Sequence, residues 1–168
     1  MDRPKRKRLR LPHFDYSSPG AYFVTICTRD RRCILSDITV GALHEAPEAH
    51  VQLTPIGLIV QAVIEALPSR YPDLAVVHFV IMPNHIHLLL QINEASLRAN
   101  QSRSLLAQAI GFLKMNSSRR IHQKYPDLVI WQRSYHEHVI RNEKDYQEIW
   151  NYIEGNPSKW AEDRYHPV

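Results

Sequence analysis

Cysteine is scarce in this chain of 168 residues, which contains only Cys27 and Cys33. Two cysteines are too few for a disulfide framework, and they do not have the Cys-x-x-Cys spacing of redox and metal motifs. Cysteine usage therefore gives no sign of an oxidising compartment. We expect both residues to be small buried hydrophobic groups in a cytoplasmic protein.

Long apolar segments are also missing from the sequence. No run approaches the ~20 apolar residues that a membrane-spanning helix needs. The charged start of the chain is not followed by the apolar stretch of a secretory signal. The sequence thus predicts a protein without a membrane partner. Its length suits one domain, and its 44% hydrophobic and 23% charged residues are ordinary for a soluble globular chain.

Positive charge is distributed unevenly along the chain. Residues 1–10 hold six positive charges and one negative charge, a net charge of +5. Since the whole chain has a net charge of +4, the other 158 residues sum to −1. A basic arm on a near-neutral body is typical of a phosphate-binding tail, although a solvated tail without a partner is the alternative. We predict a basic arm over residues 1–12 and a single domain over 13–168. The arm residues expected to contact nucleic acid are Lys5, Arg6, Lys7, Arg8 and Arg10.

The order of predicted elements is β-α-β-β-α-β followed by a helix. Runs of β-branched and aromatic residues predict the strands, whereas caps and helical spacing of apolar residues predict the helices. The strands are expected at 21–28, 74–82, 85–92 and 129–140, and the helices at 55–67, 104–124 and 143–154. A short edge strand is expected at 33–35, and the stretch 38–52 is expected to be irregular. This is the α+β, ferredoxin-like arrangement, an antiparallel sheet with two helices on one face and a further C-terminal helix.

The most informative stretch is Val80–Leu90, which reads V-I-M-P-N-H-I-H-L-L-L. His85 and His87 are two residues apart in a predicted strand, so both imidazoles project from the same face. Two imidazoles on a rigid strand can supply two ligands to a divalent metal. A pair of histidines that merely lies on a half-buried strand is the alternative. The preceding Met-Pro-Asn turn and the following leucines favour the metal site.

The last predicted helix contains Tyr152 and Asn156, which lie one turn apart on the same helix face. A tyrosine phenolate that attacks a phosphodiester forms a covalent 5′-phosphotyrosine and releases a 3′ hydroxyl, so the ends can be rejoined later. A metal would polarise the phosphate, and the Asn156 amide oxygen could complete its ligands. Gly155 weakens this helix by about 1 kcal/mol relative to alanine. Since Asn156 precedes a proline, it could also lie past the last turn.

Three separated motifs resemble the REP-associated tyrosine transposases, a group within the IS200-like single-tyrosine (HUH) family. They are M-P-N-H-I-H-L-L at 82–89, W-Q-R with E-H-V-I-R between 131 and 141, and Y-I-E-G-N-P at 152–157. The likeness spans residues 8–160. It places the family's nucleophile on Tyr152, its two metal histidines on His85 and His87, and its third metal-side residue on Asn156.

The resemblance implies that the chain cleaves and joins single-stranded DNA next to a hairpin, as a monomer or a homodimer. It implies Mg²⁺ or Mn²⁺ as the cofactor, although two imidazoles would also accept Zn²⁺ or Ni²⁺. We further expect DNA contacts from Lys114, Arg119 and Arg120 on the second long helix.

Three questions stay open from the sequence. His138 and its neighbour Glu137 could stand behind the metal ligands, or His138 could contact DNA, but a purely structural histidine is as plausible. A His-x-His metallohydrolase that activates water would not need Tyr152. A non-catalytic nucleic-acid-binding module on the same fold would carry exposed aromatic residues on its central strands, where Phe79 is the only aromatic residue.

Overall fold

A four-stranded antiparallel sheet, with strand order β4-β5-β1-β6, forms the centre of the molecule. The structure, a computed structural model, describes residues 20–41, 48–93 and 104–167. The strands in that order are Leu74–Ile81, His85–Ile92, Gly20–Cys27 and His136–Ile140. Within the sheet, the chain order and strand order are those of the ferredoxin-like arrangement, so the α+β prediction is confirmed.

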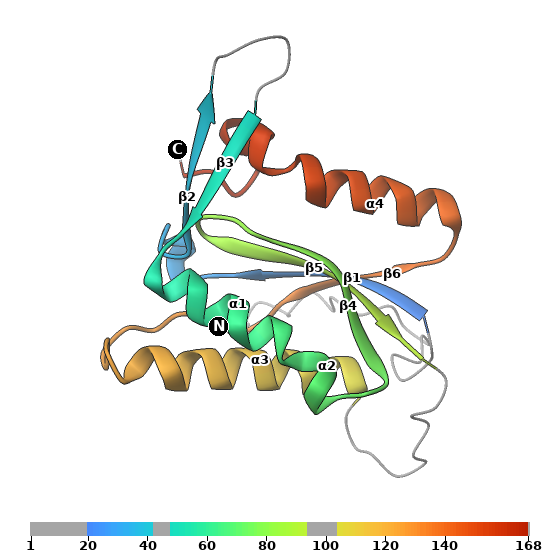
Figure 1. Cartoon of the computed structure of the whole chain (residues 1–168), viewed down its shortest axis with the longest axis horizontal. Coiled ribbons are helices and arrows are strands. Elements are labelled where there is room, and N and C mark those ends of the chain that lie inside the picture. The colour runs from blue at the N-terminus through green and yellow to red at the C-terminus, as the bar shows by residue number, and fades with distance from the viewer. Residues whose placement is uncertain (1–19, 42–47, 94–103, 168) are drawn as a thin grey trace, which may run out of the picture.

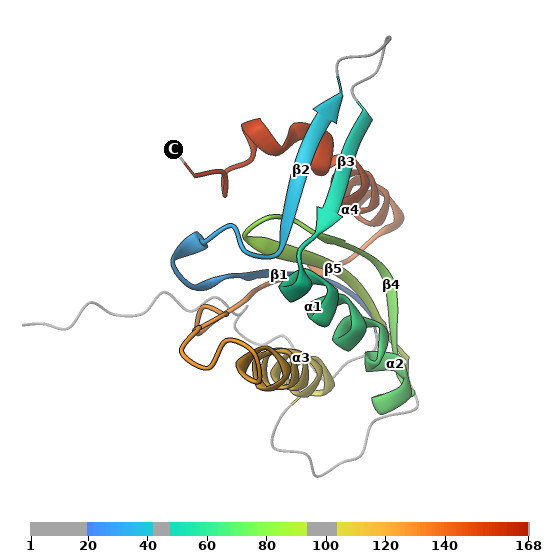
Figure 2. The same cartoon turned by 60° about the vertical axis from the view of Figure 1, so that its left-hand side comes forward.

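Helices cover both faces of this sheet (Figures 1 and 2). One face carries α1 (Pro55–Glu65), the short α2 (Leu67–Arg70) and α3 (Leu105–His122). The other face carries α4 (Glu143–Gly155), which is followed by the 3-10 helix η3 (Pro157–Glu162). The main hydrophobic core lies between the sheet and α1 and α3, and a smaller cluster lies under α4.

Strand β5 alternates between these two sides. Ile86 and Leu88 belong to the core under α1 and α3, whereas Leu89 packs with Ile149 and Ile153 of α4. Since side chains two residues apart share a face, the odd-numbered residues of β5 point toward α4. The strand thus delivers its two histidines to the space under α4.

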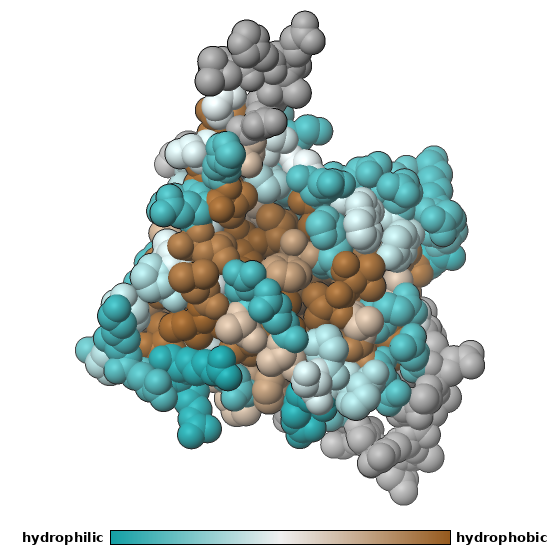
Figure 3. Space-filling model, in the orientation of Figure 1, coloured by the Kyte–Doolittle hydropathy of each residue, from teal (hydrophilic) through white to brown (hydrophobic). Residues whose placement is uncertain are grey.

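The helix that covers the histidines begins at a side-chain cap. Asn142 accepts a hydrogen bond from the backbone N–H of Asp145 at 2.9 Å, as expected for an N-cap residue. Ile149 and Ile153 fix the buried side of α4 against the sheet. Figure 3 shows hydrophilic side chains along its outer side, and apolar side chains over the middle of the viewed face. The Asn142 cap fixes where α4 begins, and its apolar side fixes which face of the helix lies against the sheet.

The prediction of irregular structure over 38–52 is wrong. Strands β2 (Ser36–Gly41) and β3 (Glu48–Leu53) pair antiparallel as a separate two-stranded ribbon that projects from the body (Figure 2). Most of β2 is exposed, so it has no buried face and shows no clear alternation of apolar and polar residues. Backbone pairing and packing against η3 hold the ribbon instead.

Three other boundaries differ from the sequence prediction. Residues 33–35 form no strand, because the N–H groups of Ile34 and Leu35 bond to the carbonyl of Pro83. The helix expected over 55–67 ends at Glu65, and Pro68 lies in the first turn of α2, where a missing N–H costs nothing. Strand β6 covers only His136–Ile140, not 129–140. No helix among the described residues is both long and apolar enough to cross a bilayer.

Candidate active site

Two buried imidazoles form the centre of the candidate site. His85 and His87 open strand β5, directly after the turn at Pro83 and Asn84, and neither side chain has accessible surface. Their Nε2 atoms are 3.1 Å apart, and their ring centroids are 4.5 Å apart. A nitrogen ligand lies about 2.0–2.1 Å from a bound zinc ion, so a single ion could contact both Nε2 atoms. The structure therefore brings the predicted pair into a geometry that suits one metal.

The outer nitrogen of each histidine has its own hydrogen-bond partner. Asn84 Oδ1 lies 2.9 Å from His85 Nδ1, and Thr25 Oγ1 of β1 lies 2.8 Å from His87 Nδ1. Since Asn84 Oδ1 can only accept, His85 carries its proton on Nδ1 and directs its Nε2 lone pair toward His87 Nε2. The Thr25 hydroxyl can donate or accept, so it suits either tautomer of His87. These partners orient both rings with Nε2 toward the same point.

Burial keeps both imidazoles neutral. It lowers the pKa of His85 to about 4, and it lowers the pKa of His87, to which the neighbouring His85 also contributes. Both rings are therefore uncharged near pH 7. Metals bind the neutral imidazole, so the site is prepared for an ion without a prior loss of protons.

Two further residues could supply oxygen ligands to an ion, and sequence reasoning missed one of them. The ligand atoms of His85, His87 and Asp163 all lie within 4.8 Å of one another. Asp163 follows η3, and no spacing pattern in the sequence connects it to the histidines. Asn156 is 4% exposed, and its Oδ1 has no hydrogen-bond partner among the described residues. A carboxylate and an unpaired buried amide oxygen are suitable ligands for Mg²⁺ or Mn²⁺.

Tyr152 lies one turn before Asn156 on α4. Asn156 keeps helical dihedral angles, with φ −61° and ψ −43°, although a proline follows, so the two side chains share a helix face as predicted. The Tyr152 ring centroid is 5.2 Å from that of His87 and 5.9 Å from that of Phe23. Its side chain is 41% exposed, so the phenol is accessible to a substrate.

The Tyr152 phenol is protonated near neutral pH. Partial burial raises its pKa, and the charge of Asp163 raises it further, while a hydrogen bond with Asn156 acts in the opposite direction. The phenol would therefore have to lose its proton as its oxygen attacks the phosphate.

The end of the described chain packs against the histidines. Tyr165 is 4% exposed, and its ring centroid lies 4.5 Å from that of His85. Its hydroxyl accepts a hydrogen bond from Arg164 Nη2 at 2.6 Å, and its carbonyl accepts one from Asn84 Nδ2 at 2.7 Å. Asn84 thus connects His85 to the C-terminal segment that carries Asp163. Sequence reasoning missed this contact, because tail and turn are 81 residues apart.

Comparison with known proteins identifies the family. Residues 58–156, more than half of the chain, match the sequence model of the family described as "Transposase IS200 like". The chain belongs to the IS200-like transposase family. A Haemophilus influenzae relative named REP-associated tyrosine transposase is 32% identical over 155 residues, which are 86% of this chain and 74% of that protein. An uncharacterised H. influenzae protein is 33% identical over 173 residues, 95% of this chain and 92% of that one.

A solved structure agrees with this assignment at the level of the fold. It is a REP-associated tyrosine transposase bound to a REP hairpin, with a TM-score of 0.62 and 22% identity, and the match covers 90% of this chain and 74% of that one. The resemblance seen in the three sequence motifs is thereby confirmed, and a transposase-type activity on DNA follows at the level of the family.

Lys114 of this IS200-like transposase has a structural partner. Its ammonium donates hydrogen bonds to the carbonyls of Gln132, Arg133 and Ser134, and burial lowers its pKa. It therefore ties the loop before β6 to α3. Its predicted contact with DNA stays a prediction.

The remaining predicted DNA contacts lie away from the histidines or outside the described residues. Arg119 and Arg120 are exposed in the last turn of α3, across the sheet from α4. The five basic residues of the N-terminal arm lie outside the described residues. Their contact with DNA therefore stays a prediction.

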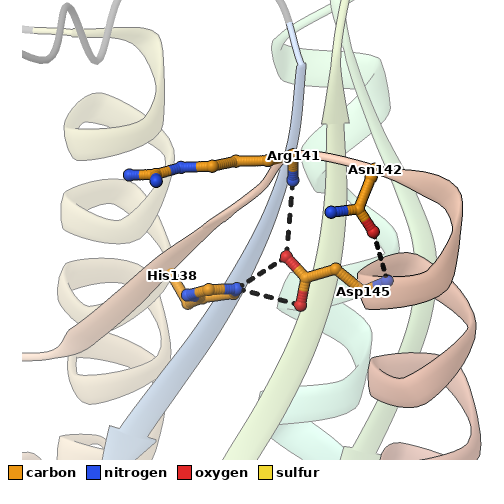
Figure 4. A network of polar contacts seen from close by, with 4 residues as sticks. All are labelled: His138, Arg141, Asn142 and Asp145. Atoms are coloured by element: carbon orange, nitrogen blue, oxygen red, sulfur yellow. Dashed lines mark hydrogen bonds and ion pairs between the residues drawn. The ribbon is translucent and has the colours of Figure 1, made fainter.

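His138 belongs to a network at the start of α4, shown in Figure 4. Its Nε2 lies 2.9 Å from a carboxylate oxygen of Asp145, which also accepts a hydrogen bond from the Arg141 N–H. The network joins β6 to the first turn of α4, so His138 supports the helix that carries the tyrosine. Glu137 lies opposite Val24, a core residue under α1 and α3, and so on the other face of the sheet from the histidines.

Proposed function

We propose that this IS200-like transposase cuts and rejoins single-stranded DNA beside a hairpin, through a 5′-phosphotyrosine on Tyr152. The observation that carries the proposal is the position of this half-exposed tyrosine, 5.2 Å from His87 between ring centroids and one helical turn from Asn156. A phenol this close to two neutral imidazoles and an unpaired amide oxygen has the surroundings that metal-assisted phosphoryl transfer requires.

Four side chains would hold the metal, which we propose to be Mg²⁺ or Mn²⁺. They are the two imidazoles, the Asn156 amide oxygen and the Asp163 carboxylate. When bound, such an ion polarises the scissile phosphate and offsets the charge that develops in the transition state. Asn84 and Thr25 orient the histidines, and α4 carries the phenol next to His87.

The chemical step is a transesterification. The Tyr152 oxygen forms a bond to phosphorus while its proton passes to solvent, and the bond from phosphorus to the 3′ oxygen breaks. The released 3′ oxygen takes a proton and becomes a hydroxyl. Because the phosphotyrosine keeps the energy of the broken ester, attack by a 3′ hydroxyl on it reverses the step and needs no further reactant.

The DNA partner follows from charge and from the relatives. We propose that the basic arm over residues 1–12, together with Arg119 and Arg120, holds the backbone of a hairpin stem. A solved relative is bound to a REP hairpin, which supports a hairpin as the substrate here. Monomer or homodimer and a cytoplasmic location stay predictions.

A denaturing gel tests the proposal. The wild-type chain is incubated with a library of single-stranded hairpins in Mg²⁺ or Mn²⁺, beside Tyr152→Phe and His85→Ala. Tyr146→Phe is the control, because Tyr146 lies on the same helix within the apolar cluster. We expect a covalent protein–DNA adduct in the wild type and the control, and none in the other two.

Two other outcomes would contradict the proposal. Cleavage that persists without an adduct in Tyr152→Phe would indicate a metallohydrolase that activates water. Binding of hairpins without cleavage in either metal would indicate a non-catalytic nucleic-acid-binding module.

A further inference from the structure

A cavity opens beside Tyr152, between the C-terminal half of α4 and the segment that follows it. Its volume is about 290 Å³. Six of the residues that line it are Tyr152, Gly155, Asn156, Lys159, Asp163 and Arg164. The cavity therefore adjoins both the proposed nucleophile and two of the proposed metal ligands. Its volume is near the lower end of the range for small-molecule sites, roughly 300–1,000 Å³. A cavity of this size can hold one monomer unit of a polymeric substrate.

Gly155 keeps this cavity open. Glycine is among the least favourable residues in a helix. Two common reasons for a glycine at a helical position, a positive φ and a close neighbouring atom, do not apply to Gly155. Gly155 is not among the described residues with positive φ, and a Cβ at this position would meet no atom within 4 Å. Gly57 is different, because a Cβ there would meet the Leu35 carbonyl oxygen. The missing side chain at Gly155 leaves room for something other than the protein.

The groups around the cavity match the chemistry of a nucleotide. Lys159 and Arg164 supply positive charge suited to a phosphate. Asn151 and Glu162, which also line the cavity, offer an amide and a carboxylate, the groups that commonly read the hydrogen-bonding edges of bases. The lining thus combines two cationic side chains with amide and carboxylate groups that can form directed hydrogen bonds.

We propose that this cavity is a nucleotide subsite, which takes the unpaired nucleotide next to the scissile phosphate. The proposal rests on the proposed function, since it assigns the site of a flanking base to the same strand that Tyr152 attacks. The base enters over Gly155, and its phosphate lies near Lys159 and Arg164. Binding there would align the scissile phosphate with the Tyr152 oxygen.

The test measures binding without chemistry. A hairpin with unpaired flanks is first selected for binding to the wild-type chain in EDTA, which removes divalent metal. Abasic sites are then introduced one at a time along the flanks, and each affinity is measured by fluorescence anisotropy. The probe is this labelled hairpin, with the wild type, Gly155→Leu and Gly111→Leu as proteins. Gly111 lies on α3, and a Cβ there also meets no atom within 4 Å, so it is a matched control.

We expect one flank position where loss of the base weakens binding to the wild type and to Gly111→Leu by about tenfold or more. At that position the same loss should weaken binding to Gly155→Leu by less than twofold, because leucine already fills the cavity. A glycine-to-leucine change in a helix raises helix propensity, so both variants are expected to fold.

Two results would overturn the subsite. One is an abasic profile of Gly155→Leu that matches the wild type, and the other is a wild type that is insensitive to every flanking base. The adduct assay is separate, since it needs metal and Tyr152. An abasic effect without any adduct would reject the proposed chemistry and keep the subsite, whereas an adduct without an abasic effect would reject the subsite alone.

Discussion

Replacement of Thr25 by valine removes one hydrogen bond from the proposed metal site and little else. Thr25 is 1% exposed on β1, and its hydroxyl lies 2.8 Å from His87 Nδ1. Valine has a similar shape and a high preference for strands, so the backbone of β1 should not change. The loss leaves a fully buried imidazole nitrogen without a partner, which costs about 1–3 kcal/mol of the free energy of unfolding. Removal of a group that orients a metal histidine lowers metal affinity by about 10–100-fold.

Two measurements separate these effects. The free energy of unfolding is measured by urea denaturation without metal, and the affinity for Mn²⁺ is measured by calorimetry. Thr39→Val is the control, because Thr39 is an exposed strand residue of β2 and should change the free energy by less than about 0.5 kcal/mol. A Thr25→Val chain that is less stable but binds Mn²⁺ as the wild type does would refute the claim that Thr25 orients a metal ligand.

Three further predictions concern stability, all measured by urea denaturation. Lys114→Met should lower the free energy of unfolding by about 1–3 kcal/mol, because three carbonyls lose their donor. Lys144→Met, at an exposed position, should change it little, and equal effects of the two variants would contradict a structural role for Lys114. Gly57→Ala should lower the free energy of unfolding by at least about 1–3 kcal/mol through overpacking, because its Cβ would collide with the Leu35 carbonyl oxygen. Gly111→Ala should instead raise it by about 1 kcal/mol, and a neutral Gly57→Ala would show that the backbone relaxes. Burial holds the pKa of His85 at about 4 against 6.5 in the unfolded chain, so the unfolded state takes up its proton first. Stability should therefore fall as the pH drops from 6.5 toward 4, and this part of the fall should be absent in His85→Ala.

The parts of the site that follow a regular period could be read from the sequence. His85 and His87 share a strand face because of the two-residue period, and Tyr152 and Asn156 share a helix face because of the helical period. Local steric preference was a poorer guide at Asn156, which is buried and keeps helical angles although Pro157 follows.

The parts that depend on long-range contacts could not be read from the sequence. Asp163 reaches the histidines only because the chain after η3 folds back and is held by Asn84 through the Tyr165 carbonyl. The Lys114 side chain reaches carbonyls up to 20 residues further along the chain, a structural contact that the sequence did not indicate. Neither contact has a periodic pattern, so neither leaves a signal in one sequence.

Peptide mapping of the covalent adduct tests the central claim most directly. The adduct with hairpin DNA is digested with protease and nuclease, and the peptide that carries the residual nucleotide is identified by mass spectrometry. The account predicts a phosphodiester link on Tyr152 and on no other tyrosine. A nucleotide on Tyr165, whose ring lies 4.5 Å from that of His85 between centroids, would contradict it, as would DNA cleavage without any modified peptide.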